Sequence, residues 1–225
     1  MNTFSRAAGK PAGSVTNFID AILDERPDLA GQLIYVPKYG SRAYTVIIGD
    51  EVFKAPVYAQ DIEAFETEYK TLQALGDNGL PIPEVMHVGK KAVFYSMTRL
   101  SGVTLYDLCN PWNDDLTPKQ KQDIAKDIAD FIVGMANAMP SQEGGYAAHT
   151  DMSSANIMID PDSKKFTGVI DFGITAYVPK YALATTSVFG DINNLVRKEF
   201  EARKAEIPDD TSTAPQTAKA PRAAC

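Results

Sequence analysis

The sequence lacks the features on which disulfide-stabilised, membrane-spanning and nucleic-acid-binding proteins depend. Its two cysteines, Cys109 and Cys225, are too few for a disulfide framework, so we expect a reducing compartment at the site of action. No apolar run approaches the length that crosses a bilayer, and we therefore expect no membrane partner. Lys and Arg number 22 against 29 Asp and Glu, and the net charge of −7 argues against a nucleic-acid partner.

The two ends of the chain differ in composition from the rest. Residues 1–13 contain no acid and are rich in Ser, Thr, Ala and Gly, and residues 206–225 are rich in Ala, Pro and Thr. Both segments are expected to be disordered, with a type III secretion signal of similar composition as the alternative for the first. With 44% hydrophobic residues, the chain has ample material for the core of one domain or of two small lobes.

Apolar periodicity in residues 14–100 predicts a sheet accompanied by helices. Ser14 can cap a helix that ends before Pro27. Apolar residues recur at helical spacing between Asp61 and Leu75. Strand-forming residues between tight turns predict a five-stranded antiparallel sheet, with its strands in residues 36–55, 85–88 and 92–98.

Lys54 ends one predicted strand, and Glu68 is the acid best placed on the following helix to meet it. At about 100° per residue, Glu68 falls roughly 60° from the centre of the apolar stripe, against about 100° for Glu66 and about 160° for Glu63. Only Glu68 therefore points inward, where it can hold the Lys54 amine. A plain surface salt bridge is the alternative.

The residues that can perform chemistry are concentrated between His149 and Gly173. Asp151 is followed five residues later by Asn156, and two apolar runs around a polar turn then lead to Asp171. The two runs predict a hairpin that brings Asn156 and Asp171 to one end. Amide and carboxylate oxygens are ligands that Mg²⁺ takes, and the Asp151 carboxylate can lie beside an acceptor hydroxyl. His149 is expected to orient the loop.

Together these residues resemble the aminoglycoside phosphotransferase branch of the protein-kinase-like fold. The resemblance covers about residues 14–200 and rests on Lys54, Glu68, Leu80-Pro81-Ile82-Pro83, His149-Thr150-Asp151, Asn156 and Ile170-Asp171-Phe172-Gly173. It implies an α+β fold of two lobes: a five-stranded antiparallel sheet plus helix in residues 14–100, and a shortened, mainly helical lobe in residues 101–205. It also implies ATP and Mg as cofactors. Asp151 would be the catalytic base, Lys54 would bind the nucleotide phosphates, and Asn156 and Asp171 would bind the metal.

The same interpretation assigns the remaining nucleotide contacts. Gly40 and Ser41 would form the loop over the phosphates, although an ordinary hairpin turn fits them equally well. Met97 would lie at the back of the nucleotide site or simply in the core. Thr98, Arg99 and Leu100 would form the hinge whose backbone meets adenine.

The chain also departs from the aminoglycoside phosphotransferases. Only about fifty residues separate the hinge from His149, and they are accounted for by helices at 104–109 and from Thr117 onward. This leaves little room for the inserted helices of an aminoglycoside pocket. The acidic motif that follows the metal-binding Asp in that branch is not evident in residues 174–183 either. An open acceptor face favours a protein acceptor over a small sugar.

Small size and the acid-free start resemble the minimal effector kinases that plant-associated bacteria inject into host cells. That group includes phosphorylation of the host's heat-shock chaperone, so the resemblance implies a secreted Ser/Thr protein kinase with such a chaperone as partner. The bacterial cytoplasm is the alternative location.

Three functional hypotheses follow from the sequence. A minimal Ser/Thr protein kinase is favoured. A small-molecule kinase of the aminoglycoside, choline or sugar type is the alternative, and an acidic protein would tolerate its cationic acceptors. A non-catalytic nucleotide-binding module is the third.

Overall fold

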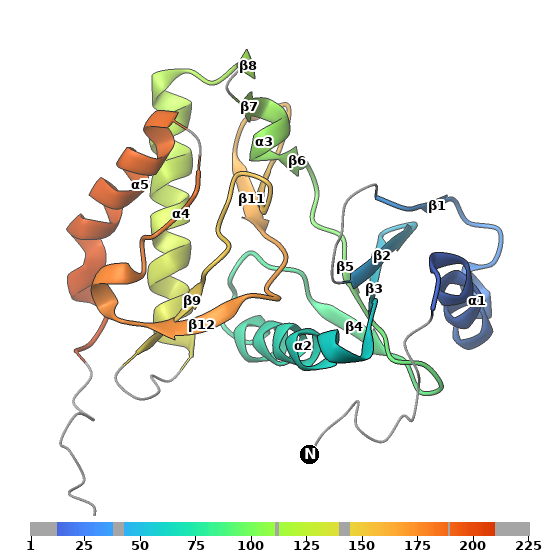
Figure 1. Cartoon of the computed structure of the whole chain (residues 1–225). Helices are drawn as coiled ribbons and strands as arrows, with labels where there is room; N and C mark the ends of the chain where they lie inside the picture. The colour runs from blue at the N-terminus through green and yellow to red at the C-terminus, as the bar shows by residue number, and fades with distance from the viewer. Residues whose placement is uncertain (1–12, 38–42, 111–112, 140–144, 189, 210–225) are drawn as a thin grey trace, which may run out of the picture.

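The computed structural model describes residues 13–37, 43–110, 113–139, 145–188 and 190–209, which form two lobes (Figure 1). The N-lobe is built on a five-stranded antiparallel sheet in the order β1-β2-β3-β5-β4, as predicted. Its strands are β1 (Ile34–Tyr35), β2 (Ala43–Ile48), β3 (Glu51–Pro56), β4 (Val85–Val88) and β5 (Tyr95–Thr98). Gly49, with φ of 59°, makes the tight turn between β2 and β3.

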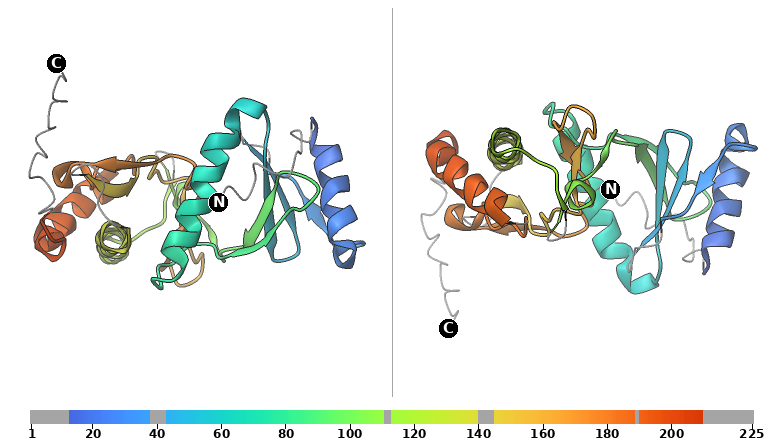
Figure 2. Two further views of the ribbon diagram at one scale, coloured as in Figure 1. Left: turned by 90° about the horizontal axis from the view of Figure 1, so that it is seen from below. Right: turned by 90° about the horizontal axis from the view of Figure 1, so that it is seen from above.

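Helices flank both faces of this sheet (Figure 2). One face is covered by α2 (Ile62–Gly76), which follows the short η2 turn (Ala59–Asp61). The other is covered by α1 (Val15–Glu25), whose predicted cap is confirmed because Ser14 Oγ accepts a hydrogen bond from the Asn17 amide at 3.1 Å. The core beneath α1 consists of Phe18, Ile22, Leu29, Val46, Ile48, Phe53, Ala55 and Phe94.

The end of α1 is tied to the sheet by two charged side chains. Glu25 accepts hydrogen bonds from three successive backbone amides of the β4–β5 loop, at 2.7 Å from Lys90, 2.8 Å from Lys91 and 3.2 Å from Ala92. Arg26 reaches across to the buried Glu51 carboxylate of β3 at 3.0 Å, before the η1 turn (Pro27–Leu29).

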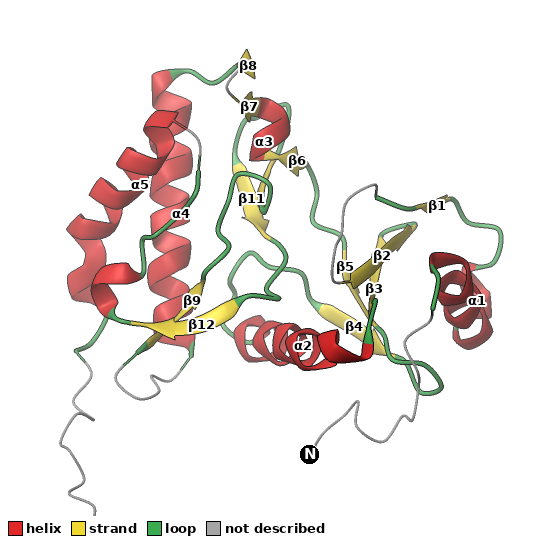
Figure 3. Cartoon of the chain, viewed as in Figure 1, coloured by secondary structure: helices red, strands yellow, loops and turns green. Residues whose placement is uncertain are grey.

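The C-lobe is mainly helical, and its two long helices, α4 and α5, pack side by side (Figure 3). The predicted helix starts at Thr104 and Thr117 are confirmed, since both hydroxyls accept the amide bonds of N-terminal caps. The elements are β6 (Val103–Thr104), α3 (Leu105–Leu108), β7 (Cys109–Asn110), β8 (Asn113–Asp114), α4 (Pro118–Ala138), β9 (Tyr146–His149), β10 (Ile157–Ile159), β11 (Phe166–Val169), β12 (Thr175–Val178), η3 (Lys180–Ala182), α5 (Gly190–Arg203) and η4 (Lys204–Glu206). None of the helices in the described residues is long and apolar enough to span a membrane.

Several features of the C-lobe were not predicted. β6 pairs with β10, and β9 pairs with β12 antiparallel, so the segment after Gly173 begins with a strand. The expected disordered tail also starts too early, because Ile207 is buried and the Tyr146 hydroxyl donates to the Pro208 carbonyl at 2.6 Å. Each of these short segments gains its structure from a distant partner, which local sequence patterns do not reveal.

Glu25→Ala should lower the free energy of unfolding by about 1–2 kcal/mol, because three loop amides lose their acceptor. Burial raises the pKa of Glu25, but the three amides and His87 outweigh it and the pKa is lowered. The stabilisation is therefore complete above the unfolded-state pKa of about 4.3 and disappears as the pH falls through the lower folded-state pKa.

Urea unfolding at pH 7 and at pH 3 measures this difference. Asp24→Ala is the matched control, since Asp24 makes an exposed ion pair with Lys91 and should contribute less than about 0.5 kcal/mol. Equal losses for the two variants at pH 7 would show that Glu25 does not cap the loop.

Candidate active site

Three charged side chains from distant parts of the chain meet where the lobes join. The Lys54 amine of β3 donates to Glu68 Oε1 and Oε2 of α2 at 2.7 and 2.8 Å, and to Asp171 Oδ1 at 2.9 Å. The side chains of Lys54 and Glu68 are 8% and 4% exposed, whereas that of Asp171 is 54% exposed. Burial acts to lower the pKa of Lys54, but Glu68 and Asp171 raise it above its usual value, so the amine stays charged.

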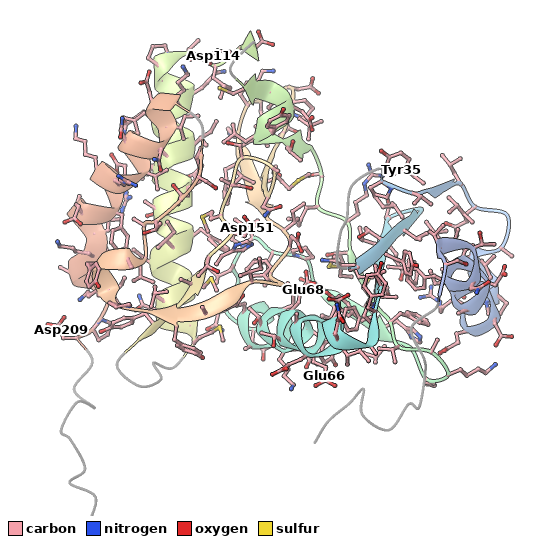
Figure 4. All side chains as sticks on the ribbon, in the orientation of Figure 1. Tyr35, Glu66, Glu68, Asp114, Asp151 and Asp209 are labelled. Atoms are coloured by element: carbon pink, nitrogen blue, oxygen red, sulfur yellow. The ribbon has the colours of Figure 1, made fainter. Side chains whose placement is uncertain are left out.

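The choice of Glu68 over the neighbouring acids is confirmed by the geometry. Glu66 lies on the side of α2 opposite to Glu68, away from Lys54 (Figure 4), and forms an i,i+4 ion pair with Lys70. The helical stripe therefore identified the inward-facing acid correctly.

Asp171 is held in place by the residues on either side of it. The Ile170 amide donates to the Asn156 carbonyl at 2.9 Å, and the Ile170 carbonyl meets His149 Nε2 at 3.0 Å. Phe172 is fully buried, and its ring lies 4.9 Å from the ring of His149. Between these anchors Asp171 adopts a φ of 66°, a conformation that L-residues rarely take, which fixes where its carboxylate points.

Asp151 and Asn156 are joined directly across the predicted catalytic loop. The Asn156 Nδ2 group donates to the Asp151 carbonyl at 2.8 Å and to its carboxylate Oδ2 at 3.3 Å. Asn156 is buried, whereas Asp151 is exposed. The β10–β11 ladder pairs Ile157 with Val169, so Asn156 lies beside the segment that leads into Asp171.

The pair of Asn156 and Asp171 fits a magnesium ion that arrives with phosphate. Among the described residues, no group of three or more His, Cys, Asp and Glu could hold a metal by itself. Mg²⁺ is commonly held by one or two carboxylates, with substrate phosphates and water completing its coordination. One carboxylate and one amide at the end of the hairpin match that requirement.

The expected hinge lies beside the N-lobe sheet, but two of its amides already have partners. The Thr98 amide donates to the Glu84 carbonyl and the Arg99 amide to the Asp50 carbonyl, both at 2.9 Å. Within the described part of the chain, the Leu100 amide is the donor of this segment without a partner. Met97 is buried in the core, and the expected phosphate loop with Gly40 and Ser41 lies outside the described residues.

The sequence did not identify Tyr95 as part of this region. Its side chain is 0% exposed, and its position on β5 lies directly opposite Lys54. An aromatic residue in an apolar strand usually belongs to the core, so only the pairing with Lys54 could have singled it out.

A match to the RIO domain covers residues 55–212, more than half of the chain. The chain belongs to the RIO domain family. The matched region contains Glu68, Asp151, Asn156 and Asp171, while Lys54 immediately precedes it. No curated protein matches the sequence.

Solved structures similar to this RIO-domain protein include aminoglycoside and macrolide phosphotransferases. The ADP-bound aminoglycoside phosphotransferase APH(2'')-Ib has a TM-score of 0.66 and 15% identity, with 84% of this chain and 83% of that chain covered. The GDP complex of aminoglycoside 2'-phosphotransferase-IIIa has a TM-score of 0.65 and 17% identity, with 86% and 87% covered. The macrolide 2'-phosphotransferase MphH from Brachybacterium faecium has a TM-score of 0.59 and 12% identity, with 85% of each chain covered.

At these identities the likeness establishes the fold alone. It confirms the predicted two-lobed fold, which this chain shares with the aminoglycoside phosphotransferases.

Glu68→Ala should lower the free energy of unfolding by about 3 kcal/mol, because Lys54 would remain buried with Asp171 as its only counterion. Glu66→Ala on the same helix should cost less than about 1 kcal/mol, since Glu66 forms a long ion pair of 3.4 Å with Lys70, whose side chain is 60% exposed. Urea unfolding of both variants at pH 7 makes the comparison. Comparable losses would mean that the buried pair adds nothing beyond a surface ion pair.

Proposed function

We propose that this RIO-domain protein is an ATP- and Mg-dependent phosphotransferase that moves a terminal phosphoryl group to an acceptor hydroxyl. The observation that carries the proposal is the convergence of Lys54, Glu68 and Asp171 from three separate elements, beside the linked pair of Asp151 and Asn156. Similar structures hold ADP or GDP, which supports a nucleotide as the phosphoryl donor.

Each residue of this group has a role that its position allows. Lys54, held by Glu68, would bind the nucleotide phosphates, and Asn156 and Asp171 would hold the magnesium ion. When bound, the metal neutralises the charge that develops on the phosphate oxygens. The exposed carboxylate of Asp151, fixed by the Asn156 amide, would accept the proton of the acceptor hydroxyl. Lys54 and Asp171 must separate from each other for these roles, because each is then needed by the nucleotide.

We infer that the acceptor is a protein hydroxyl. Between Leu100 and His149, the described residues form only the short elements β6, α3, β7, β8 and β9 and the single long helix α4, so they build no additional helical wall beside Asp151. An apolar side chain also lies exposed close to the base: Ile174 is 45% exposed, and its carbonyl accepts from both the amide and the hydroxyl of Thr150. More specifically, we propose that the protein is secreted into a host cell and phosphorylates Ser or Thr in a host chaperone.

A small-molecule hydroxyl is the second candidate acceptor, and the structural neighbours favour it. Those neighbours include a streptomycin–ATP complex and a complex with GDP and kanamycin. The net charge of −7 is compatible with a cationic acceptor of that kind.

Incubation with labelled ATP and Mg²⁺ separates the candidates. One arm contains host-cell lysate and the purified chaperone, and the other contains a panel of aminoglycosides. Label on a protein Ser or Thr supports the first acceptor, and label on an aminoglycoside supports the second. If neither arm is labelled and Asp171→Ala binds ATP as the wild type does, the protein is a non-catalytic nucleotide-binding module.

Asp151→Asn should lower kcat by about 10²–10⁴-fold, because the amide cannot accept the proton of the acceptor. Its affinity for ATP and Mg²⁺ should stay at the wild-type value, since Asp151 does not contact Lys54. Steady-state kinetics with the acceptor identified above, together with calorimetric titration of ATP, provide the two measurements. Unchanged turnover would remove Asp151 from the base role.

Asp171→Ala should abolish Mg-dependent transfer, because the metal loses its carboxylate ligand. Asp162→Ala is the matched control: Asp162 lies in the exposed turn of the same hairpin, and its removal should leave activity unchanged. Turnover is measured over a series of Mg²⁺ concentrations. Asp171→Ala activity that recovers fully at high Mg²⁺ would indicate that another group holds the metal.

A further inference from the structure

Tyr95 carries a buried hydroxyl that has no hydrogen-bond partner within the described part of the chain. The residue is paired with Lys54 across the β3–β5 ladder, so both side chains project from the same face of the sheet. Its ring packs against two α2 residues that flank Glu68 in sequence, with centroids 4.8 Å from Phe65 and 5.7 Å from Tyr69. The hydroxyl is therefore directed into the region that the Lys54–Glu68 pair occupies.

The electrostatic environment of the Tyr95 hydroxyl also shows that it lies near the carboxylates of Glu68 and Asp171. Burial raises the pKa of Tyr95 well above its usual value. Glu68 raises it further, both by its charge and as a hydrogen-bond acceptor close to the hydroxyl, and Asp171 adds to this by its charge. A phenol in this setting stays protonated and can only gain by donating its hydrogen to one of those carboxylates. An unpartnered buried hydroxyl is costly, so its presence calls for a state in which it is used.

The Lys54 amine explains why the hydroxyl makes no direct hydrogen bond to Glu68 in this structure. An ammonium group has three hydrogens, and here all three are directed at carboxylate oxygens: two at Glu68 and one at Asp171. Nucleotide phosphates would draw Lys54 donors away from these oxygens. Glu68 is buried, so any oxygen that loses Lys54 would need another donor.

We infer that Tyr95 is a positioning residue that donates its hydroxyl to Glu68 when Lys54 turns to the phosphates of a bound nucleotide. The inference deepens the proposed function and rests on nucleotide binding at Lys54. Tyr95 then keeps Glu68, and through it the remaining Lys54 contact, in place while the amine is shared with phosphate. The hydroxyl stabilises the nucleotide-bound state more than the nucleotide-free state, in which it makes no direct hydrogen bond.

Tyr95→Phe tests this difference between the two states. Without nucleotide, its Tm should equal or exceed that of the wild type, because an unpartnered polar group has been removed from the core. With ATP and Mg²⁺, its Kd and KM for ATP should rise roughly 10- to 100-fold, the equivalent of one hydrogen bond to a charged group, while kcat at saturating ATP stays unchanged.

Tyr69→Phe is the matched control, since it removes a hydroxyl from the adjacent ring. The Tyr69 hydroxyl already has Gln73 as a hydrogen-bond partner. Its loss should therefore lower the Tm by a few degrees and leave the Kd for ATP unchanged. A Tyr95→Phe variant that behaves like Tyr69→Phe overturns the inference, because the hydroxyl would then be bonded before nucleotide arrives.

A second measurement does not depend on nucleotide. In a Lys54→Met background, Glu68 has lost its amine donors and the Tyr95 hydroxyl should turn to it, so adding Tyr95→Phe should lower the Tm by several degrees. The same change in the wild-type background should not lower it. Additive effects contradict the proposed role of Tyr95, whereas wild-type protein that fails to bind ATP contradicts the proposed function itself.

Discussion

The fold depends on a single buried cation shared between the two lobes. Lys54 is almost fully buried, and removing an ammonium group from water costs several kcal/mol unless carboxylates surround it. Glu68 supplies one carboxylate from the N-lobe helix and Asp171 supplies the other from the C-lobe loop. Because the two acids come from different lobes, satisfying this charge also fixes how β3, α2 and the end of the β10–β11 hairpin lie relative to one another.

The remaining structure supports that group from each side. On the N-lobe, α1 packs on the outer face of the sheet and anchors its end through Glu25 and Arg26, while α2 covers the inner face. On the C-lobe, Phe172 fills the core beneath His149 and holds Asp171 in a left-handed conformation that costs about 1–3 kcal/mol. Such strain persists only where surrounding contacts over-determine it, which is consistent with a residue placed for chemistry.

The Lys54–Asp171 ion pair links this arrangement to function, because a bound nucleotide would replace each residue's partner. Lys54 and Asp171 satisfy each other without ligand, yet both are the groups that a nucleotide with its metal would require. This ion pair keeps the site intact without ligand. A ligand that brings phosphate to Lys54 and a cation to Asp171 can separate the two side chains. Tyr95 lies where an additional donor would be needed once the amine is divided in this way.

Local patterns in the sequence determined which elements form and which residues could perform the chemistry. The stripe of α2 identified Glu68, the caps at Ser14 and Thr117 fixed helix starts, and two apolar runs predicted the hairpin between Asn156 and Asp171. These features depend on neighbours in sequence, so short-range physical rules reach them. Only the tertiary structure decided that β9 pairs with β12, that Ile207 is buried, that two of the hinge amides already have partners, and that Tyr95 faces Lys54. Each of these depends on a contact between segments that lie far apart along the chain, and such pairings are set by the packing of the whole core.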